Sequence, residues 1–267
     1  MKPGKLLKDR IQKNQITTGV LATFHVWPGL VELCKRANLD YLILDMEHQT
    51  FDAPMIAQAC AIGRHLDFPI LIRPPAAEFT PMRLALDLGP CGLLVPYVES
   101  AADVQVIQDA VYMKPRGRRR PGGLGNFWVP DYHYETWKLE VEDDLVILPQ
   151  IESRKGLENV GAIAAHPLTT AIAVGPYDLS ADLGCCWDPA NPAMVEALAR
   201  IRKAGRDAGK NMWMIGDGPT LLRQGFTFLC LAEPTLFLEA RLRDLAGQVK
   251  RGNAADSGAA SGAMPLP

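Results

Sequence analysis

Two carboxylates stand at the ends of two short apolar runs in the middle of the sequence. The run LVILPQIE ends at Glu152, and the run AIAVGPYD ends at Asp178. One helix-length segment separates the runs, so we expect both to be parallel strands joined by a right-handed crossover. Neighbouring parallel strands lie about 4.8 Å apart. The two acids should therefore face the same small volume.

Two carboxylates in one small volume repel each other unless a cation lies between them or one of them takes up a proton. Gln150 adds a neutral oxygen beside Glu152. Such an all-oxygen set, with room for water and substrate, suits Mg²⁺ or Mn²⁺ better than zinc. The competing interpretation is that Glu152 and Asp178 merely cap the helices that follow them, because acids are common where helices begin. Spacing alone leaves both interpretations open.

The two runs belong to a longer alternation of apolar runs and segments with helical patterning. Eight runs are predicted to be strands, at residues 18–24, 41–45, 69–73, 92–95, 145–152, 171–178, 212–215 and 226–231. Eight strands alternating with helices in a chain of 267 residues predict an α/β fold, a single (β/α)₈ TIM barrel. We place this domain at residues 1–250.

Two segments do not fit the alternation. Residues 114–142 are rich in Gly, Pro, Arg and aromatic side chains and are longer than an ordinary loop between a strand and a helix. This length indicates a functional or mobile segment. Residues 251–267 are low in complexity, which predicts a disordered C-terminal tail.

Composition limits the partners and the compartment. The formal net charge is −2, so no global charge points to nucleic acid or to a membrane surface. The 6 cysteines are scattered, which argues for reduced thiols and against a disulfide framework or a structural zinc site. The N-terminus has no apolar signal segment, and no apolar run reaches about 18 residues. These features predict a cytoplasmic protein that neither spans a membrane nor binds nucleic acid.

Chemistry in a barrel of this kind collects at the C-terminal ends of the strands. The predicted strand ends carry seven polar side chains: Asp45, Glu47, His48, Arg73, Gln150, Glu152 and Asp178. Any one of them alone has an ordinary structural explanation, whereas the whole set at one rim predicts an active site. His48 is the candidate base, because Asp45 three positions earlier could fix its tautomer and steady the imidazolium. Without such a partner, a histidine near a strand end is usually an ordinary polar residue.

Five segments together resemble the HpcH/HpaI aldolase family, the class II metal-dependent pyruvate aldolases related to the citrate lyase β-subunit. They are LDMEHQTFD (44–52), ILIRPP (70–75), ALDLGPCGLLVPYVES (85–100), PQIESRKGLENV (149–160) and VGPYDLSADLG (174–184). The similarity runs from about residue 15 to 250, and the D-x-E-H and G-P-x-D-L-S motifs are its strongest part. The resemblance implies a (β/α)₈ barrel whose last helix is exchanged between subunits, in a homohexamer built as a trimer of dimers.

The resemblance also implies roles for the metal and pyruvate. Glu152 and Asp178 would bind Mg²⁺, Mn²⁺ or Co²⁺, and Gln150 would position metal-bound water or substrate. Arg73 would donate to the keto oxygen and stabilise the enolate where charge develops; its alternative, and compatible, role is an ion pair with Glu47. The pyruvate carboxylate would be held by the turn that opens the next helix, at Gly175, Pro176 and Tyr177.

Further residues are implied to act on the aldehyde half or between subunits. His48 and Asp45 would move the proton on the aldehyde oxygen through a water, and Glu47 would support Arg73 or a water. Asp87 resembles a residue contributed to the neighbouring subunit's site. Arg119 lies in PRGRRRPG (115–122), similar to the family's P-x-G-x-R-G-x-G loop, with Arg120 where the family usually has glycine. The arginine run is interpreted either as a clamp for an anionic substrate or as a solvated loop.

The predicted function is that of a divalent-metal-dependent aldolase, a lyase that forms or cleaves 2-keto-4-hydroxy acids through a pyruvate enolate and a short aldehyde. The alternatives are an oxaloacetate decarboxylase or an acyl-CoA lyase of the same superfamily, and a catalytically weak paralogue that binds a keto acid. Glu47 and His48 favour the aldolases over the CoA branch. The presence of Arg73, Glu152 and Asp178 argues against the paralogue, because a degenerate site should lose its ligands first.

Overall fold

Eight parallel strands close into one barrel in the computed structural model, which describes residues 1–48, 52–120, 122, 127–130 and 133–255. The strands are β1 (Thr17–Ala22), β2 (Tyr41–Asp45), β3 (Ile70–Arg73), β4 (Gly92–Val95), β5 (Val146–Ile151), β6 (Ala171–Val174), β7 (Asn211–Ile215) and β8 (Phe228–Cys230). Each strand pairs in parallel with its neighbours in chain order, and β8 closes onto β1. The prediction of a (β/α)₈ barrel is confirmed.

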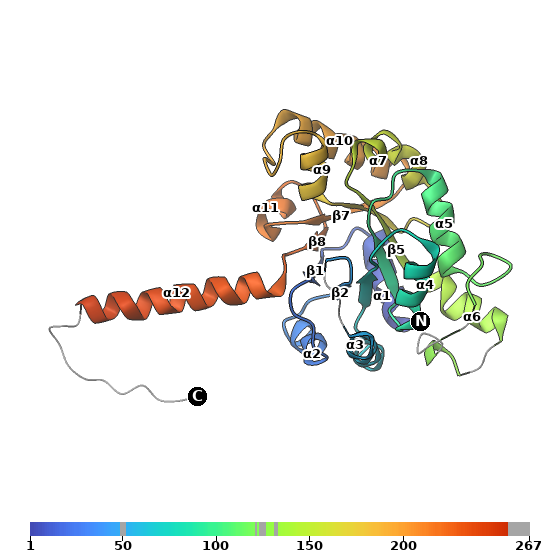
Figure 1. Ribbon diagram of the computed structural model, residues 1–267, viewed down its shortest axis with the longest axis horizontal. Helices are drawn as coiled ribbons and strands as arrows, with labels where there is room; N and C mark the ends of the chain where they lie inside the picture. Colours follow the sequence, from blue (N-terminus) through green and yellow to red (C-terminus); the bar gives the residue numbers. More distant parts are fainter. Residues whose placement is uncertain (49–51, 121, 123–126, 131–132, 256–267) are drawn as a thin grey trace.

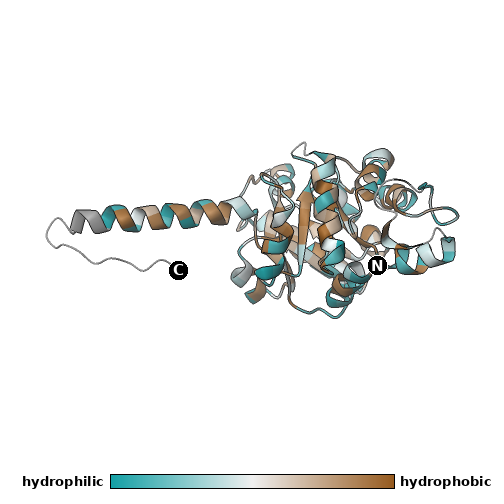
Figure 2. Cartoon of the chain, turned by 90° about the horizontal axis from the view of Figure 1, so that it is seen from below, coloured by the Kyte–Doolittle hydropathy of each residue, from teal (hydrophilic) through white to brown (hydrophobic). Residues whose placement is uncertain are grey.

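Helices surround the barrel and connect successive strands (Figure 1). They are α1 (Lys2–Gln12), α2 (Gly29–Arg36), α3 (Ala53–His65), α4 (Phe79–Asp87), α5 (Ala101–Val111), α6 (Tyr134–Glu140), the 3₁₀ turn η2 (Glu142–Asp144), α7 (Arg154–Glu158), α8 (Val160–Ala165), α9 (Pro176–Asp182), α10 (Pro192–Asp207), α11 (Gly218–Arg223) and α12 (Pro234–Ala255). Because both faces of every strand are covered, the strands are continuous apolar runs (Figure 2).

The register of the sheet determines which strand ends meet. Asp45 at the end of β2 is paired with Arg73 at the end of β3. Ile151 at the end of β5 is paired with Val174 at the end of β6, so Glu152 and Gly175, the next residue on each strand, are neighbours. The C-terminal ends of these four strands therefore bring Asp45, Arg73, Glu152 and Gly175 to one rim of the barrel.

Two predicted elements differ from the observed ones. The run ending at Asp178 is not a strand to its end: β6 stops at Val174, and Asp178 lies in the first turn of α9. Pro176 explains the change, because its fixed φ suits the first turn of a helix and it has no N–H for a strand ladder. The single helix predicted between β5 and β6 is divided at Asn159 into α7 and α8. The Asn159 side chain donates to the carbonyls of Glu99 (2.9 Å) and Lys155 (3.0 Å), which stabilises this local break.

The two segments outside the alternation also have defined parts. Helix α6 lies within residues 114–142, and Met113 forms an isolated bridge with Arg119. Helix α12 extends to Ala255, into the segment predicted to be a tail, and residues 256–267 lie outside the described residues. Figure 1 shows α12 projecting away from the barrel, and Figure 2 shows hydrophobic residues along its length. Its exposed apolar side chains are Leu236, Phe237, Leu238, Leu242, Leu245 and Val249.

Most of the cysteine side chains lie in the core of the barrel. All 6 cysteines are free, and Cys34, Cys60, Cys91 and Cys230 are buried in the core. Over the described part of the chain, none of the helices combines the length and the apolar character that crossing a membrane requires.

Candidate active site

A buried ion pair joins the ends of β2 and β3. The Nε of Arg73 donates to Oδ1 of Asp45 at 2.8 Å, and its Nη2 donates to Oδ2 of the same carboxylate. Nη1 of Arg73 lies 3.1 Å from Oε2 of Glu47. Asp45 is 0% exposed and Arg73 is 6% exposed. A bidentate fork of this kind compensates two charges that would otherwise be costly to bury.

Further hydrogen bonds keep Asp45 ionised. The Thr23 hydroxyl donates to Oδ2 at 2.9 Å, and the backbone N–H of Glu47 donates to Oδ1 at 2.9 Å. Burial alone would raise the pKa of Asp45, but the hydrogen bonds and the charge of Arg73 outweigh it and hold the pKa below its usual range. Burial likewise would lower the pKa of Arg73, and Asp45 and Glu47 raise it instead. The pair is therefore fixed as a carboxylate and a guanidinium.

His48 stands beside Glu47 and not beside Asp45. Its Nε2 lies 3.7 Å from Oε2 of Glu47, and its side chain is 54% exposed. The pairing of His48 with Asp45 stays a prediction; the strand register places Asp45 opposite Arg73, and its oxygens accept from Arg73, Thr23 and the N–H of Glu47. Glu47 is the carboxylate that can orient His48, and it contacts Arg73 as well.

Glu152 is a second buried carboxylate at the same rim, directly after β5. Its Oε1 accepts from the N–H of Tyr97 at 2.7 Å, and its Oε2 accepts from the Nε2 of Gln150 at 2.8 Å. It is 2% exposed. Burial, as the largest cause, together with the charges of Glu47 and Asp178 raises the pKa of Glu152 to about 8, against the lowering effect of the Tyr97 N–H and of Arg73.

Asp178 faces the other acids from the first turn of α9. Its charge raises the pKa of Glu152 and also that of Glu47. The carboxylates of Glu47, Glu152 and Asp178 are therefore near enough for their charges to interact, and Asp178 acts from a helix rather than from a strand end.

The residues present fit a hard divalent cation. The Oε1 of Gln150 is buried and accepts no hydrogen bond from the described residues, which leaves one neutral oxygen free beside two acids. Glu152 lacks an ion pair of its own within 4.0 Å in the described chain, so a cation beside it would remove the penalty that raises its pKa. The described residues hold no cluster of three or more His, Cys, Asp or Glu arranged for a metal. A cation here would rest on two acids, an amide oxygen and solvent or substrate, which suits Mg²⁺ or Mn²⁺.

Gly175 makes the close approach of β6 to Glu152 possible. A Cβ at this position would lie 2.2 Å from Oε2 of Glu152 and 2.6 Å from Nε2 of Gln150. No side chain fits there without displacing the oxygen set, so this glycine is required by packing rather than by its backbone angles.

Substitution of Gly175 by alanine should therefore weaken the binding of Mn²⁺ by about ten- to a hundred-fold, because the added methyl group displaces Glu152. Titration of the metal-depleted protein with Mn²⁺, followed by electron paramagnetic resonance, measures this loss. The matched control is Gly161→Ala, since a Cβ at Gly161 meets nothing within 4 Å. Equal Mn²⁺ affinities of the two variants would contradict the assignment of the oxygen set.

Asp87 and Arg119 pair with each other outside this cluster. Nη2 of Arg119 donates to Oδ1 of Asp87 at 2.9 Å, and its guanidinium lies 5.5 Å from the ring centroid of Trp137. Arg119 is 4% exposed. Within the described chain, no hydrogen bond or ion pair links this pair to Arg73 or Glu152. In the described chain, Asp87 and Arg119 are therefore bonded to each other and not directly to these two site residues.

The arginine run does not present a free clamp at Arg116, Arg118 and Arg119. Each of these side chains forms an ion pair within the same chain. Arg116 pairs with Glu142 and Asp143, Arg118 pairs with Asp109, and Arg119 pairs with Asp87. Nearby Asp and Glu residues thus hold the loop together, and Arg119 is buried rather than solvated.

Two contributions to the site escaped sequence reasoning. Thr23 follows β1 and donates to Asp45, a role that its type permits but does not signal. Tyr97 contributes its backbone N–H to Glu152 from a residue with φ +50°, and a main-chain donor leaves no mark in the side-chain pattern.

Tyr177 and Trp187 form an exposed edge-to-face pair beside Asp178, with ring centroids 6.4 Å apart.

The chain is similar to known proteins in family, sequence and fold. The family model described as HpcH/HpaI aldolase/citrate lyase matches residues 26–229. The chain is 32% identical to a hydroxypyruvate/pyruvate aldolase of Pseudomonas aeruginosa, over 97% of this chain and 98% of that relative. It is 31% identical to a 4-hydroxy-2-oxovalerate aldolase of Rhodococcus jostii (strain RHA1), over 80% of this chain and 87% of that relative. The crystal structure of an HpcH/HpaI aldolase from Desulfitobacterium hafniense DCB-2 is similar in fold, with a TM-score of 0.84, 24% identity, and coverage of 91% of this chain and 96% of that one.

Proposed function

Because the chain belongs to the HpcH/HpaI aldolase/citrate lyase family, we propose that it is a carbon–carbon lyase, a divalent-metal-dependent aldolase that forms or cleaves 2-keto-4-hydroxy acids through a pyruvate enolate. The activities for which the two relatives are named, hydroxypyruvate/pyruvate aldolase and 4-hydroxy-2-oxovalerate aldolase, support this reaction class. The observation that carries the proposal is the buried Arg73 fork beside the oxygen set of Gln150, Glu152 and Asp178.

Glu152, Asp178 and Gln150 would hold the metal, as Mg²⁺, Mn²⁺ or Co²⁺. A divalent cation bound there would act as a Lewis acid and draw electron density from the keto oxygen of the substrate. Arg73 is the protein's own donor to that oxygen, and the rigid grip of Asp45 and Glu47 holds its guanidinium in place before the reaction. A preorganised donor of this kind stabilises charge that develops during proton loss from the methyl group.

The turn after β6 is the proposed support for the pyruvate carboxylate. The N–H of Gly175 is already donated to the carbonyl of Ile151 at 3.1 Å, and Pro176 has no N–H. The backbone donor left in this turn is that of Tyr177, with Asp178 following, so Gly175 and Pro176 contribute shape and helix initiation rather than hydrogen bonds.

His48 is the proposed acid and base for the aldehyde oxygen. It is exposed at the rim, and Glu47 can steady its charged form from 3.7 Å. Asp45 then acts indirectly. It binds Arg73, and it accepts a hydrogen bond from the N–H of Glu47 at the start of the loop that carries His48.

Replacement of His48 by alanine should lower aldol turnover by about a hundred-fold or more, since general acid–base groups contribute on this scale. Proton exchange at the pyruvate methyl group should change much less, because that step does not move a proton on the aldehyde oxygen. Both rates are measured on the same preparation, with His65→Ala, an exposed histidine at the end of α3, as the control. An equal loss in the two rates would remove the assigned role.

We propose that Asp87 and Arg119 act in an assembly of several copies of this chain. We propose a homohexamer, a trimer of dimers, in which α12 is exchanged between subunits and Asp87, with Arg119 behind it, completes a neighbouring site. The apolar side chains exposed on α12 support burial against a second copy. Native mass by light scattering tests the assembly. The net charge of −2 and the free thiols support a cytoplasmic protein without nucleic-acid or membrane partners.

The direct test of the function is exchange of the pyruvate methyl protons, followed by NMR in heavy water with Mg²⁺, Mn²⁺ or Co²⁺ and with a chelator. Fast exchange that requires the metal is the expected result, and an aldehyde screen then identifies the second substrate. Absence of exchange with every metal would overturn the pyruvate enolate. Activity with oxaloacetate or a CoA thioester would then identify one of the two superfamily alternatives, and failure of both would leave the binding paralogue.

A further inference from the structure

A cavity of about 750 Å³ lies at the N-terminal end of the barrel, opposite the rim that carries Glu152 and Arg73. The residues that line it precede or begin β6, β7 and β8, and others come from α1 and from the C-terminal part of α10. Its volume is in the range of pockets that hold small molecules. The aldolase reaction proposed above makes no use of this end of the molecule.

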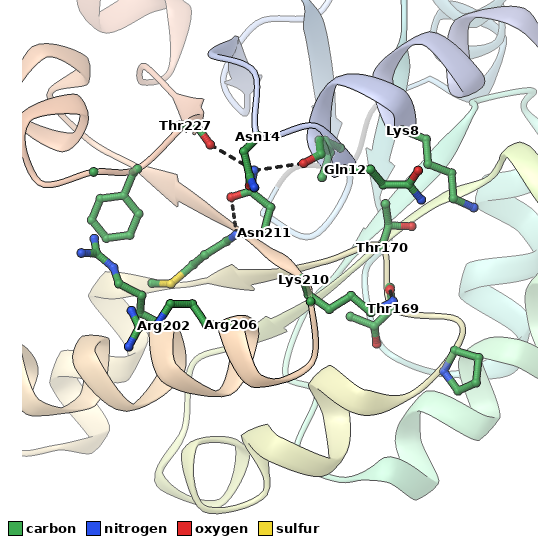
Figure 3. A pocket seen from close by; sticks show the side chains of 16 residues that line it. Lys8, Gln12, Asn14, Thr169, Thr170, Arg202, Arg206, Lys210, Asn211 and Thr227 are labelled. Atoms are coloured by element: carbon green, nitrogen blue, oxygen red, sulfur yellow. Dashed lines mark hydrogen bonds between the residues drawn. The ribbon is translucent and has the colours of Figure 1, made fainter.

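Four cationic side chains line this cavity, and Asp and Glu are absent from the described residues around it. Lys8 enters from α1, Arg202 and Arg206 come from α10, and Lys210 lies just before β7 (Figure 3). Neutral hydrogen-bonding groups, such as those of Thr169 and Asn211, lie between them. A basic lining of this kind is unexpected in a chain whose net charge is −2.

Carboxylates of the described chain do not neutralise these cations by ion pairs, whereas the neighbouring face of α10 shows the usual arrangement. There, Lys203 lies 2.5 Å from Asp207. Around the cavity, the Nζ of Lys8 donates instead to the carbonyls of Asp143 at 2.8 Å and Leu145 at 3.3 Å, and that of Lys210 donates to the carbonyl of Thr169 at 2.6 Å. An ammonium group has three N–H donors, so both lysines retain donors for a ligand.

The arginines form a second cationic pair on the α10 wall. Arg202 is held over the ring of Phe226, with 4.1 Å between its Cζ and the ring centroid, and the charge of Arg206 acts on it. Burial lowers the pKa of Arg202, and the charge of Arg206 lowers it further. Burial also lowers the pKa of Lys8; the charge of Asp144 opposes this shift, and the charge of Lys210 adds to it. The cations of each pair thus repel each other, and an anion between them would relieve the repulsion.

We propose that this cavity binds a small organic anion with at least two negative charges, of the phosphate or carboxylate type. Two pairs of cations on different walls match two anionic groups, and the intervening neutral groups match the body of the ligand. Cations that retain N–H donors, and that form no ion pair with a carboxylate of the described chain, provide the charge-assisted hydrogen bonds that such a ligand requires. The site is separate from the aldolase centre and does not depend on the function proposed for that centre.

Isothermal titration calorimetry of the full-length protein, freed of metal on a chelating resin, tests the proposal. The probes are inorganic pyrophosphate for the phosphate source and propane-1,2,3-tricarboxylate for the carboxylate source. A salt concentration of about 0.15 M suppresses general attraction to surface charge, because screening then acts over about 8 Å. Saturable binding of at least one probe, with one site per chain, is the expected result, and the probe that binds identifies the source.

Two variants place the binding in the cavity. The double variant R202Q/R206Q should bind the probe about ten-fold more weakly or worse, since a ten-fold loss corresponds to about 1.4 kcal/mol, the scale of a single charge-assisted hydrogen bond. Gln12→Glu, an isosteric change in a lining residue, should also weaken binding because it adds a negative charge. The matched control is R200Q/K203Q, which removes the same charge from α10 outside this cavity and should change the affinity by less than about two-fold.

Three outcomes would overturn the proposal. The first is that neither probe binds saturably. The second is that R202Q/R206Q binds as well as the unchanged protein, or that R200Q/K203Q loses as much affinity. The third is that Glu152→Gln abolishes the binding, since that residue lies at the opposite end of the barrel.

Discussion

Glu152→Gln is expected to abolish metal-dependent exchange of the pyruvate methyl protons. The substitution keeps the size and the acceptor for the N–H of Tyr97 but removes the negative charge that a divalent cation requires. A Lewis-acid metal supplies several kcal/mol to the developing enolate, and about 4 kcal/mol corresponds to about a thousand-fold in rate. We therefore expect an exchange rate lower by about a thousand-fold or more, measured by NMR in heavy water, and loss of Mn²⁺ binding in the same protein.

The fold should tolerate this change. The amide of Gln150 can turn to present its unpaired Oε1 to the new side chain, so the buried contact is restored. Glu158→Gln, on the exposed end of α7, is the matched control and should keep full metal binding. Exchange that persists in Glu152→Gln, or that proceeds in metal-stripped buffer, would contradict a metal held by Glu152.

The same variant carries a signature in stability. In the metal-free protein, the pKa of Glu152 is about 8 against an ordinary value of 4.5, so between these values the folded state binds a proton that the unfolded state has lost. Stability contributed by this group therefore falls as the pH rises from 4.5 to about 8. Glu152→Gln lacks the titrating group, and its melting temperature should decline less over this pH range than that of the unchanged protein.

Arg73→Ala is expected to lower the exchange rate by about a hundred-fold or more, the loss associated with one preorganised oxyanion donor. The variant should also be less stable, because it leaves Asp45, which is 0% exposed, without its cation. Breaking a buried ion pair in this way costs about 3–5 kcal/mol. Exchange must therefore be measured below the melting temperature of the variant.

Two further variants separate the effect on the reaction from the effect on folding. Arg73→Lys keeps a cation beside Asp45 but loses the planar fork, so exchange should still fall while most of the stability returns. Arg116→Ala removes the arginine that pairs with another buried acid, Glu142, and neither residue has a proposed role in the reaction. This variant should be less stable but should keep its exchange rate. Equal exchange losses in Arg73→Ala and Arg116→Ala would mean that Arg73 acts only through stability.

Much of the fold followed from the sequence because parallel barrel strands are buried on both faces. Such strands are continuous apolar runs, and the runs at β2 (Tyr41–Asp45) and β4 (Gly92–Val95) have the predicted bounds. The polar residues that end these runs also followed, since a parallel barrel brings every strand's C-terminal end to one rim. The chemical types at the rim, acids, an arginine and a histidine, were therefore determined by the sequence.

The partners of those residues were decided by the tertiary structure. Sequence spacing suggested Asp45 as the partner of His48; the register of β2 against β3 adds Arg73 as a direct partner of Asp45, and Glu47 is the carboxylate that lies 3.7 Å from His48. Spacing does not contain register, because register depends on how two distant strands align. The same limit applies to Tyr97, whose contribution is a backbone N–H on Glu152.

The cavity at the N-terminal end was equally beyond the sequence. Lys8 lies in the first helix, and Arg202 and Lys210 lie near the end of the chain, so no motif joins them. Closure of the barrel brings α1 and α10 to the same opening, and the absence of a carboxylate among the described lining residues becomes evident at that point. The sequence thus determined the fold and the chemistry available at the rim, because burial and strand direction are local properties. The pairing of charges across the molecule depends on contacts between distant segments, and these exist only after the barrel has closed.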